Sequence, residues 1–233
     1  NERYEAWGNL ARKLAHEIKN PLTPIQLTID RIKNKYTDQI TTDDQNNFKE
    51  NLKIINNQIK QIENLVNEFS DFARMPKPTL KNNDLVKILN ENIKLLSELD
   101  KSIKISLVTK NDSIAFKCDK EQLARVFFNL IKNSIESIQQ KAEKNPDFNK
   151  KISIEILSNN HHINFTLIDN GIGFKENTNI KDILNPYFTT KKEGTGLGLS
   201  IVNKIINDHN GELEFYPLND GAKIEIYFKL DGN

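Results

Sequence analysis

Residues 48–69 read FKENLKIINNQIKQIENLVNEF, and their apolar side chains recur at alternating steps of four and three. An unbroken alternation of this kind is the heptad pattern of a helix that packs lengthwise against another helix. The stretch therefore predicts one long amphipathic helix that needs a helical partner. The residues of this seam are Phe48, Leu52, Ile55, Ile59, Ile62, Val66 and Phe69.

The preceding segment supplies that partner. Its apolar residues between Leu22 and Tyr36 also step by three and four, and a polar turn at residues 37–44 joins the two patterns. The pair should fold into an antiparallel helical hairpin. Because a hairpin cannot bury both of its apolar faces alone, we expect two copies to pair as a homodimeric four-helix bundle. The alternative is a monomeric hairpin that packs against the rest of the chain.

A histidine stands on the polar face of the first helix. At about 100° per residue, His16 lies roughly 200° from the apolar side chains of Leu14 and Ile18, and so it should face water. Glu17 follows it directly, and Asn20 lies one turn further on. A water-facing imidazole beside an acid and an amide suits a nucleophile. On this segment alone, an ordinary surface histidine is the competing interpretation.

Prolines mark two places in this part of the chain. Pro21 removes a backbone donor inside the first helical pattern, which predicts a bend next to His16. The second helical pattern ends at Arg74, and residues 75–78 read Met-Pro-Lys-Pro, which is typical of a stiff linker. The expected organisation is a helical domain at residues 1–75, a linker at 76–79 and a second domain at 80–233.

The overall composition narrows the function classes. Lys and Arg number 33 against 32 Asp and Glu, so the net charge of +1 does not favour a nucleic-acid partner. The single cysteine, Cys118, excludes a disulfide framework, and the four histidines lack metal-ligand spacing. No apolar run reaches the roughly 20 residues that span a bilayer. The chain begins at Asn1 within a helical pattern, and we therefore interpret it as a fragment that meets a membrane only through a missing N-terminal part.

The second domain mixes helix and strand. Helical patterns occupy residues 85–99, 119–142 and 195–210, and the middle one opens with a capping-box-like Asp119. Alternating apolar residues predict strands near residues 103–108, 152–156, 163–167, 213–215 and 224–228. This order predicts an α+β two-layer sandwich, in which helices cover one face of a mixed sheet.

Two polar clusters of this domain suit nucleotide chemistry. Asn129 and Asn133 share one face of the middle helix, with Lys132 close by, and neutral oxygen ligands suit a Mg²⁺ that also binds phosphates. Asp169 ends an apolar strand, where its carboxylate could accept a hydrogen bond from an exocyclic amine such as that of adenine. Gly171 and Gly173 would let the backbone approach a flat ring. Taken singly, a solvated helix face and a plain turn are the alternatives.

A glycine-rich segment precedes the last helix. Gly194, Gly196 and Gly198 leave backbone N–H groups free at a helix start, where such groups bind phosphate with help from the helix dipole. Neither the dinucleotide fingerprint nor the Walker loop matches this segment. We interpret residues 175–193, which precede it, as a lid over a nucleotide.

Together, the order and spacing of these clusters resemble the catalytic core of sensor histidine kinases. The resemblance covers essentially the whole chain, and residues 15–26 are most similar to the nitrogen-regulation NtrY-like branch. Residues 16–21 look like the H box, 129–133 like the N box, 169–173 like the G1 box, 186–191 like the F box and 194–199 like the G2 box.

The resemblance implies a dimerisation and histidine phosphotransfer hairpin, followed by a GHKL-type ATP-binding domain. It implies ATP-dependent autophosphorylation of His16 and transfer of the phosphoryl group to an aspartate of a response regulator receiver domain. Glu17 would orient the imidazole, and Asn20 could orient a water for a regulator phosphatase activity. The implied localisation is that of a cytoplasmic fragment of an inner-membrane sensor kinase.

The resemblance also implies how ATP and Mg²⁺ are bound. Mg²⁺ is expected at Asn133 and Asn129, adenine at Asp169, and the outer phosphates at Lys191, Lys192 or Thr195. The full set of expected ATP-binding residues is Asn129, Lys132, Asn133, Asp169, Gly171, Gly173, Lys191, Thr195, Gly196, Leu197 and Gly198.

Two positions depart from the common family pattern. Ala222 stands where many relatives carry a threonine near adenine, and Glu136 follows the N box where many kinases carry Lys-Tyr or Lys-Phe. Two other functions compete with the kinase interpretation. An ATP-driven clamp or chaperone of the same superfamily would not need His16, and a non-catalytic scaffold would not need the polar clusters that this chain keeps.

Overall fold

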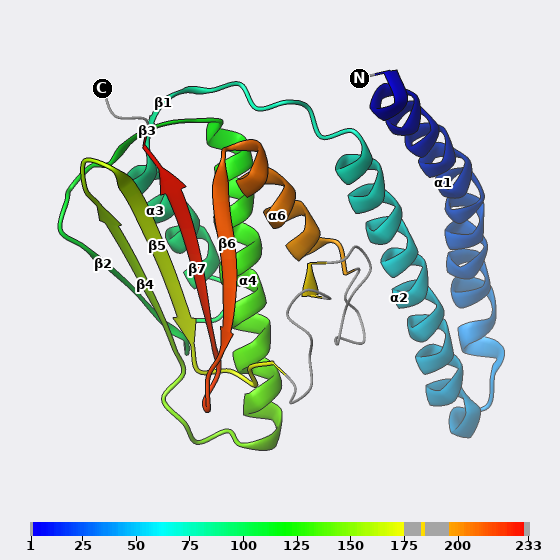
Figure 1. The fold of residues 1–233 in the computed structure, drawn as a ribbon. Helices are drawn as coiled ribbons and strands as arrows, with labels where there is room; N and C mark the ends of the chain where they lie inside the picture. Colours follow the sequence, from blue (N-terminus) through cyan, green and yellow to red (C-terminus); the bar gives the residue numbers. More distant parts are fainter. Residues whose placement is uncertain (1, 175–182, 185–195, 231–233) are drawn as a thin grey trace. The chain divides into compact units, whose positions relative to one another are not determined.

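The computed structural model describes residues 2–174, 183–184 and 196–230, and the chain divides into two compact units. The first unit contains helix α1 (Glu2–Tyr36), the short 3-10 helix η1 (Thr37–Gln39) and helix α2 (Thr42–Ala73) (Figure 1). Helix α1 is continuous through Pro21 and Pro24, so the proline beside the H-box histidine does not end the helix. Across the described residues, none of the helices is both long and apolar enough to cross a membrane.

The hairpin core is narrower than the sequence pattern predicts. Leu22 and Ile29 of α1 pack with Leu52 and Ile59 of α2 in one buried cluster. Between Ala11 and Ile18, the buried positions of α1 are two alanines rather than the larger apolar residues, and small side chains of this kind allow two helix backbones to approach closely. The alanines are Ala11 and Ala15, whereas Leu14, Ile18 and Ile25 are exposed by 41, 42 and 46%.

The second unit contains two sheets and three helices among the described residues. Strands β2, β4, β5, β7 and β6 form the larger sheet in that order, with β2 parallel to β4 and every other pair antiparallel. The elements in chain order are β1 (Lys81–Asp84), α3 (Leu85–Ser97), β2 (Lys104–Thr109), β3 (Ala115–Cys118), α4 (Lys120–Lys144), β4 (Lys151–Ser158), β5 (His162–Asp169), α6 (Gly198–Asp208), β6 (Gly211–Pro217) and β7 (Ala222–Lys229).

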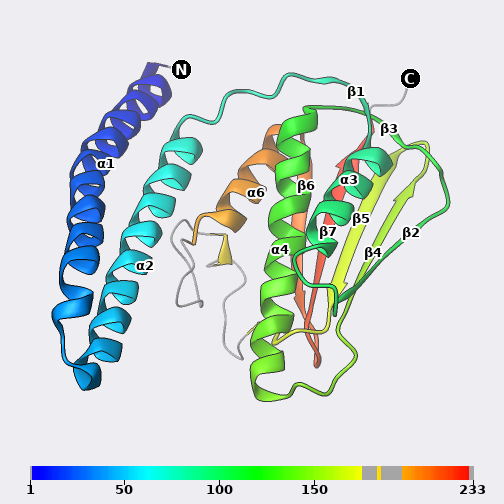
Figure 2. The ribbon, with the colours of Figure 1, turned by 180° about the vertical axis from the view of Figure 1, so that it is seen from behind.

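Helices α3, α4 and α6 all lie on one face of the larger sheet (Figures 1 and 2). The core forms there, because every second residue of the central strands points toward the helices and is buried. Phe127 of α4 meets Phe165 of β5 with 5.2 Å between ring centroids. The predicted two-layer sandwich on a mixed sheet is therefore confirmed.

The antiparallel pair β1–β3 was not predicted from the sequence. Strand β1 reads KNND and carries no apolar alternation, so it forms through its pairing with β3 rather than through a pattern of its own. Asp84 ends β1 and caps α3: its Oδ1 accepts hydrogen bonds from the N–H groups of Val86 (3.0 Å) and Ile114 (3.1 Å). One carboxylate thus joins the small sheet to the helix.

Asp119 caps α4, as the sequence pattern predicts. Its Oδ1 accepts from the N–H groups of Glu121 and Gln122, both at 3.1 Å, and its Oδ2 accepts from Thr79 N–H at 2.8 Å. In a capping box, the N–H of the capping residue would in turn bond a side chain three residues later. Here the Asp119 N–H instead donates to Nε2 of buried His209 at 3.0 Å, which is a tertiary contact.

Candidate functional site

His16 is exposed on α1 and opens onto a shallow hollow of about 270 Å³ between the two helices of the hairpin. Three cationic side chains from the two helices line this hollow together with one carboxylate, which suits a site that receives an anionic group. Glu17 and Asn20 are also exposed on α1. The residues that line the hollow are Arg12, Ala15, His16, Lys19, Asn67, Ser70, Asp71 and Arg74.

The predicted metal-binding amides lie on α4. Asn129 and Asn133 are half-buried one turn apart, and exposed Lys132 forms a 3.7 Å ion pair with Glu136. Ser134, which follows Asn133, is buried and donates a hydrogen bond to Asp169 of β5. The helix therefore links the amide pair to the predicted adenine-binding carboxylate.

Among the charged residues of the predicted site that the structure describes, Asp169 is the most deeply buried. Only 4% of its surface is exposed, although it ends a strand. Oδ2 accepts from Ser134 Oγ at 2.9 Å, and Oδ1 accepts from Gly171 N–H at 2.9 Å. Burial raises the pKa of this carboxyl, and the hydrogen bonds from Gly171 and Ser134 together with the charge of Lys141 only partly oppose that effect.

The glycines of this loop serve backbone packing. A Cβ on Gly171 would lie 2.2 Å from Ser137 Oγ, and a Cβ on Gly221 would lie 1.8 Å from the Asp169 carbonyl oxygen. Gly173 (φ +66°) and Gly221 (φ +99°) also adopt left-handed backbone that disfavours side chains. The loop after Asp169 thus packs tightly between α4 and the β6–β7 turn. This close packing is one structural reason for glycine here, and it differs from the predicted reason, which was the approach of the backbone to a flat ring.

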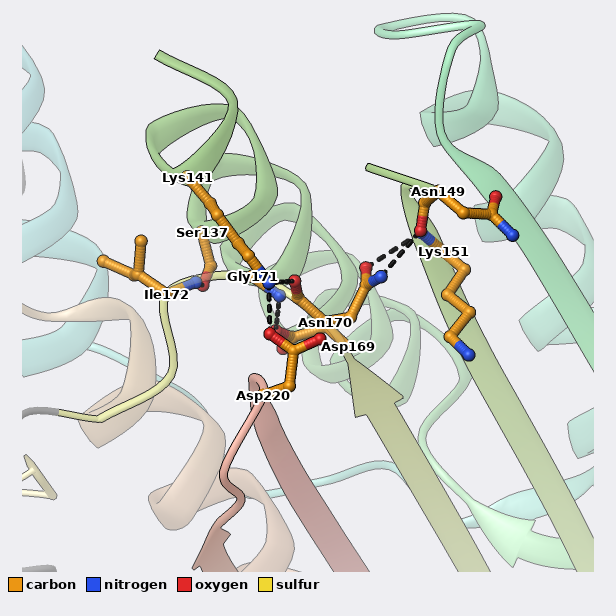
Figure 3. Close-up of polar contacts among 9 residues, drawn as sticks. All are labelled: Ser137, Lys141, Asn149, Lys151, Asp169, Asn170, Gly171, Ile172 and Asp220. Atoms are coloured by element: carbon orange, nitrogen blue, oxygen red, sulfur yellow. Dashed lines mark hydrogen bonds and ion pairs between the residues drawn. The ribbon is translucent and has the colours of Figure 1, made fainter. Parts of the chain in front are cut away.

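Hydrogen bonds to α4 and to the segment that leads into β4 hold the loop after Asp169 in place (Figure 3). Asn170 donates to the carbonyl oxygen of Asn149 at 2.6 Å and accepts from Lys151 N–H at 3.0 Å. Ile172 N–H donates to Ser137 Oγ at 3.1 Å. Sequence reasoning missed these supporting residues because they carry no motif of their own and meet only in the fold.

The glycine-rich segment is described only from Gly196 onward. Gly196 has φ +71°, Leu197 is buried, and Gly198 is the first residue of α6, three residues later than the helix start that the sequence predicts. A Cβ on Gly198 would meet nothing within 4 Å. Lys191, Lys192, Thr195 and nearly all of the predicted lid at 175–193 lie outside the described residues.

Comparison with known proteins agrees with this layout. A model of the His Kinase A (phospho-acceptor) domain matches residues 6–78, and one of the histidine kinase-, DNA gyrase B- and HSP90-like ATPases matches residues 118–232. The chain belongs to the sensor histidine kinases. An NtrY-like sensor histidine kinase of Rickettsia bellii is 36% identical over 99% of this kinase chain and 36% of its own length.

Two further relatives support the assignment. The nitrogen regulation protein NtrY of Azorhizobium caulinodans is 34% identical over 99% of this chain and 30% of its own length. The crystal structure of histidine kinase ThkA in complex with response regulator protein TrrA matches at a TM-score of 0.66 and 25% identity, over 98% of this chain and 63% of that one. The chain spans about a third of the length of the curated relatives.

Proposed function

We propose that this kinase chain transfers the γ-phosphoryl group of ATP to His16 and then to an aspartate on the receiver domain of a response regulator. The observation that carries the proposal is the buried Asp169, held by Ser134 and Gly171 in an ATPase fold whose chain also presents an exposed histidine among cations. An ATP-driven clamp would not need that histidine. The ThkA complex with its regulator supports the choice of partner.

Asp169 fits the adenine amine by its chemistry. An ionised carboxylate offers about four lone pairs, of which hydrogen bonds from Ser134, Gly171 and the Ala222 backbone occupy three, and this leaves room for a further hydrogen bond. Asn129 and Asn133 would hold Mg²⁺ through their amide oxygens, and the ion would neutralise charge on the phosphates. We assign Lys132, Lys191, Thr195 and the segment Gly196–Gly198 to the nucleotide by the family resemblance alone.

His16 would attack as a neutral imidazole. A ring nitrogen forms a bond to the γ-phosphorus while the bond from phosphorus to the bridging oxygen breaks, and ADP leaves. Glu17 would accept a hydrogen bond from the other ring N–H, stabilising the charge that develops. Arg12 and Arg74 line the hollow at His16 and would neutralise the transferred group. Asn20 would orient a water that attacks the aspartyl phosphate of the regulator, which releases inorganic phosphate and restores the aspartate.

A homodimer is part of this proposal. Beside the buried seam of the hairpin, a second stripe of apolar side chains stays exposed on both helices, and monomeric proteins seldom leave such a stripe in water. A second hairpin would cover it and complete a four-helix bundle that leaves the two histidines on its outer surface. The stripe comprises Leu14, Ile18 and Ile25 on α1 with Ile55, Ile62 and Leu65 on α2.

Incubation with γ-labelled ATP and Mg²⁺ tests the proposal. The chain should acquire a label that is labile in acid and stable in base, as expected of phosphohistidine. His16→Gln should remain unlabelled while binding ATP normally, and a purified receiver domain should remove the label. ATP binding without labelling of the unaltered chain would refute autophosphorylation and favour a scaffold or clamp.

A further inference from the structure

One lysine of α4 touches both chain segments that enclose Asp169. The Lys141 ammonium donates to the carbonyl oxygen of Asn170 at 2.8 Å and forms an ion pair with Asp220 (Figure 3). It also lies 4.6 Å from the ring centroid of Phe148. With its side chain 21% exposed, Lys141 is well covered for a lysine, whereas the Asp220 side chain is 66% exposed.

These two contacts bear on the position of the Asp169 carboxylate. Asn170 follows Asp169 directly, and Asp220 precedes Gly221, whose α-carbon would place a Cβ 1.8 Å from the Asp169 carbonyl oxygen. Lys141 therefore ties the loop after β5 and the turn before β7 to the same helix that carries Ser134. Without it, Asn170 and the β6–β7 turn would lose these bonds to α4, because the hydrogen bonds of the nearby Ser137 within the described part of the chain go to Ile172.

We infer that Lys141, in its ion pair with Asp220, is a positioning residue of the nucleotide site, which holds Asp169 at one place and orientation for the adenine amine. The inference rests on the proposed role of Asp169. Lys141 acts through the loop, and its ammonium also adds a positive charge that favours the ionised carboxylate. An exposed ion pair without such a role contributes little to the free energy of folding.

Calorimetric titration of the whole chain with ATP and with GTP tests this inference. Lys141→Met should weaken ATP binding roughly tenfold, the lower end of the effect of removing a group that supports a binding residue. The preference for ATP over GTP should fall too, because a misplaced carboxylate no longer selects the adenine amine. Lys141→Arg should restore most of both, and Asp220→Asn should produce a smaller loss.

Lys120→Met is the matched control. Lys120 lies at the other end of α4 and makes a 3.2 Å ion pair with Glu91, far from the loop. Its ATP affinity and base preference should equal those of the unaltered chain. Urea unfolding of every variant separates lost binding from lost folding, and the exposed Asp220→Asn keeps the test valid if Lys141→Met folds poorly.

Two results would overturn the inference about Lys141 without affecting the proposed function. Unchanged affinity and unchanged ATP preference in both Lys141→Met and Asp220→Asn would overturn the inference and leave the proposed function standing. A loss that Lys141→Arg does not restore would also overturn it, because the cation would then be irrelevant. Failure of the unaltered chain to bind ATP would overturn the proposed function and the inference together.

Discussion

Asp169 combines its proposed role in binding adenine with a cost to folding. Because burial raises the pKa of this carboxyl in the folded state, the folded chain holds its proton more tightly than the unfolded chain. Its contribution to stability is therefore favourable only at acid pH, and it is lost as pH rises through the folded pKa. A charge that costs stability at neutral pH is expected where function requires it.

Replacement of Asp169 by Asn should separate the two effects. ATP affinity should fall roughly 10- to 100-fold, the worth of a hydrogen bond to a charged group. The free energy of unfolding at neutral pH should stay equal or rise, because the buried charge is gone while one oxygen remains for Ser134 or Gly171. Titration with ATP and urea unfolding measure both, and a large loss of stability with retained affinity would contradict the argument.

Cys118 should be inert in the folded kinase. The thiol is fully buried, and burial raises its pKa to about 11, so only roughly one thiol in 10,000 is ionised at pH 7. Labelling by a thiol reagent should therefore follow unfolding of the ATPase unit and slow when ATP is added. Rapid labelling of the folded protein at neutral pH would show that strand β3 opens locally.

At the scale of the element, two aspartates start helices α3 and α4 and join them to other parts of the unit. Burial acts to raise the pKa of Asp84 and of Asp119, but hydrogen bonds outweigh it, chiefly those from Ile114 to Asp84 and from Thr79 to Asp119, and both pKa values lie below the ordinary 3.8. The stability that they contribute is present above that value and is lost as pH falls through the folded pKa.

Asp119→Ala should lower the free energy of unfolding by about 1–2 kcal/mol, the usual worth of a helix N-cap. The deficit should be measurable by urea unfolding at neutral pH. It should shrink as pH falls below about 4, where the carboxylate takes up a proton first in the unfolded chain and then, at lower pH, in the folded chain. Asp119→Asn is the control, since it keeps a capping oxygen without charge. An equal deficit at every pH would rule out the carboxylate as its source.

At the scale of the whole molecule, the exposed apolar stripe of the hairpin predicts the oligomeric state. Ile62→Glu places a charge on that stripe, where Ile62 is 42% exposed, and should convert a dimer to monomers in light scattering. Leu95→Glu, at a residue of α3 that is 61% exposed, should leave the dimer intact. ATP affinity should be unchanged in both, and a native chain that is monomeric would overturn the prediction.

Sequence alone determined the order of the main helices and of the five strands of the larger sheet, and the places of the polar clusters. The heptad seam at residues 48–69, the alternating strands and the Asp119 cap are local patterns, and local patterns are read from neighbouring residues. The family assignment followed in the same way, because its motifs are short and contiguous.

Tertiary structure decided what long-range contacts control. Only the fold showed that Ala11 and Ala15 are buried, that KNND becomes a strand, and that His209 replaces the expected partner of Asp119. It also brought Ser134 and Lys141 to the loop at Asp169 from some 30 residues away along the chain. The physical reason is that burial, close backbone approach and shared hydrogen bonds depend on residues that only the folded chain brings together.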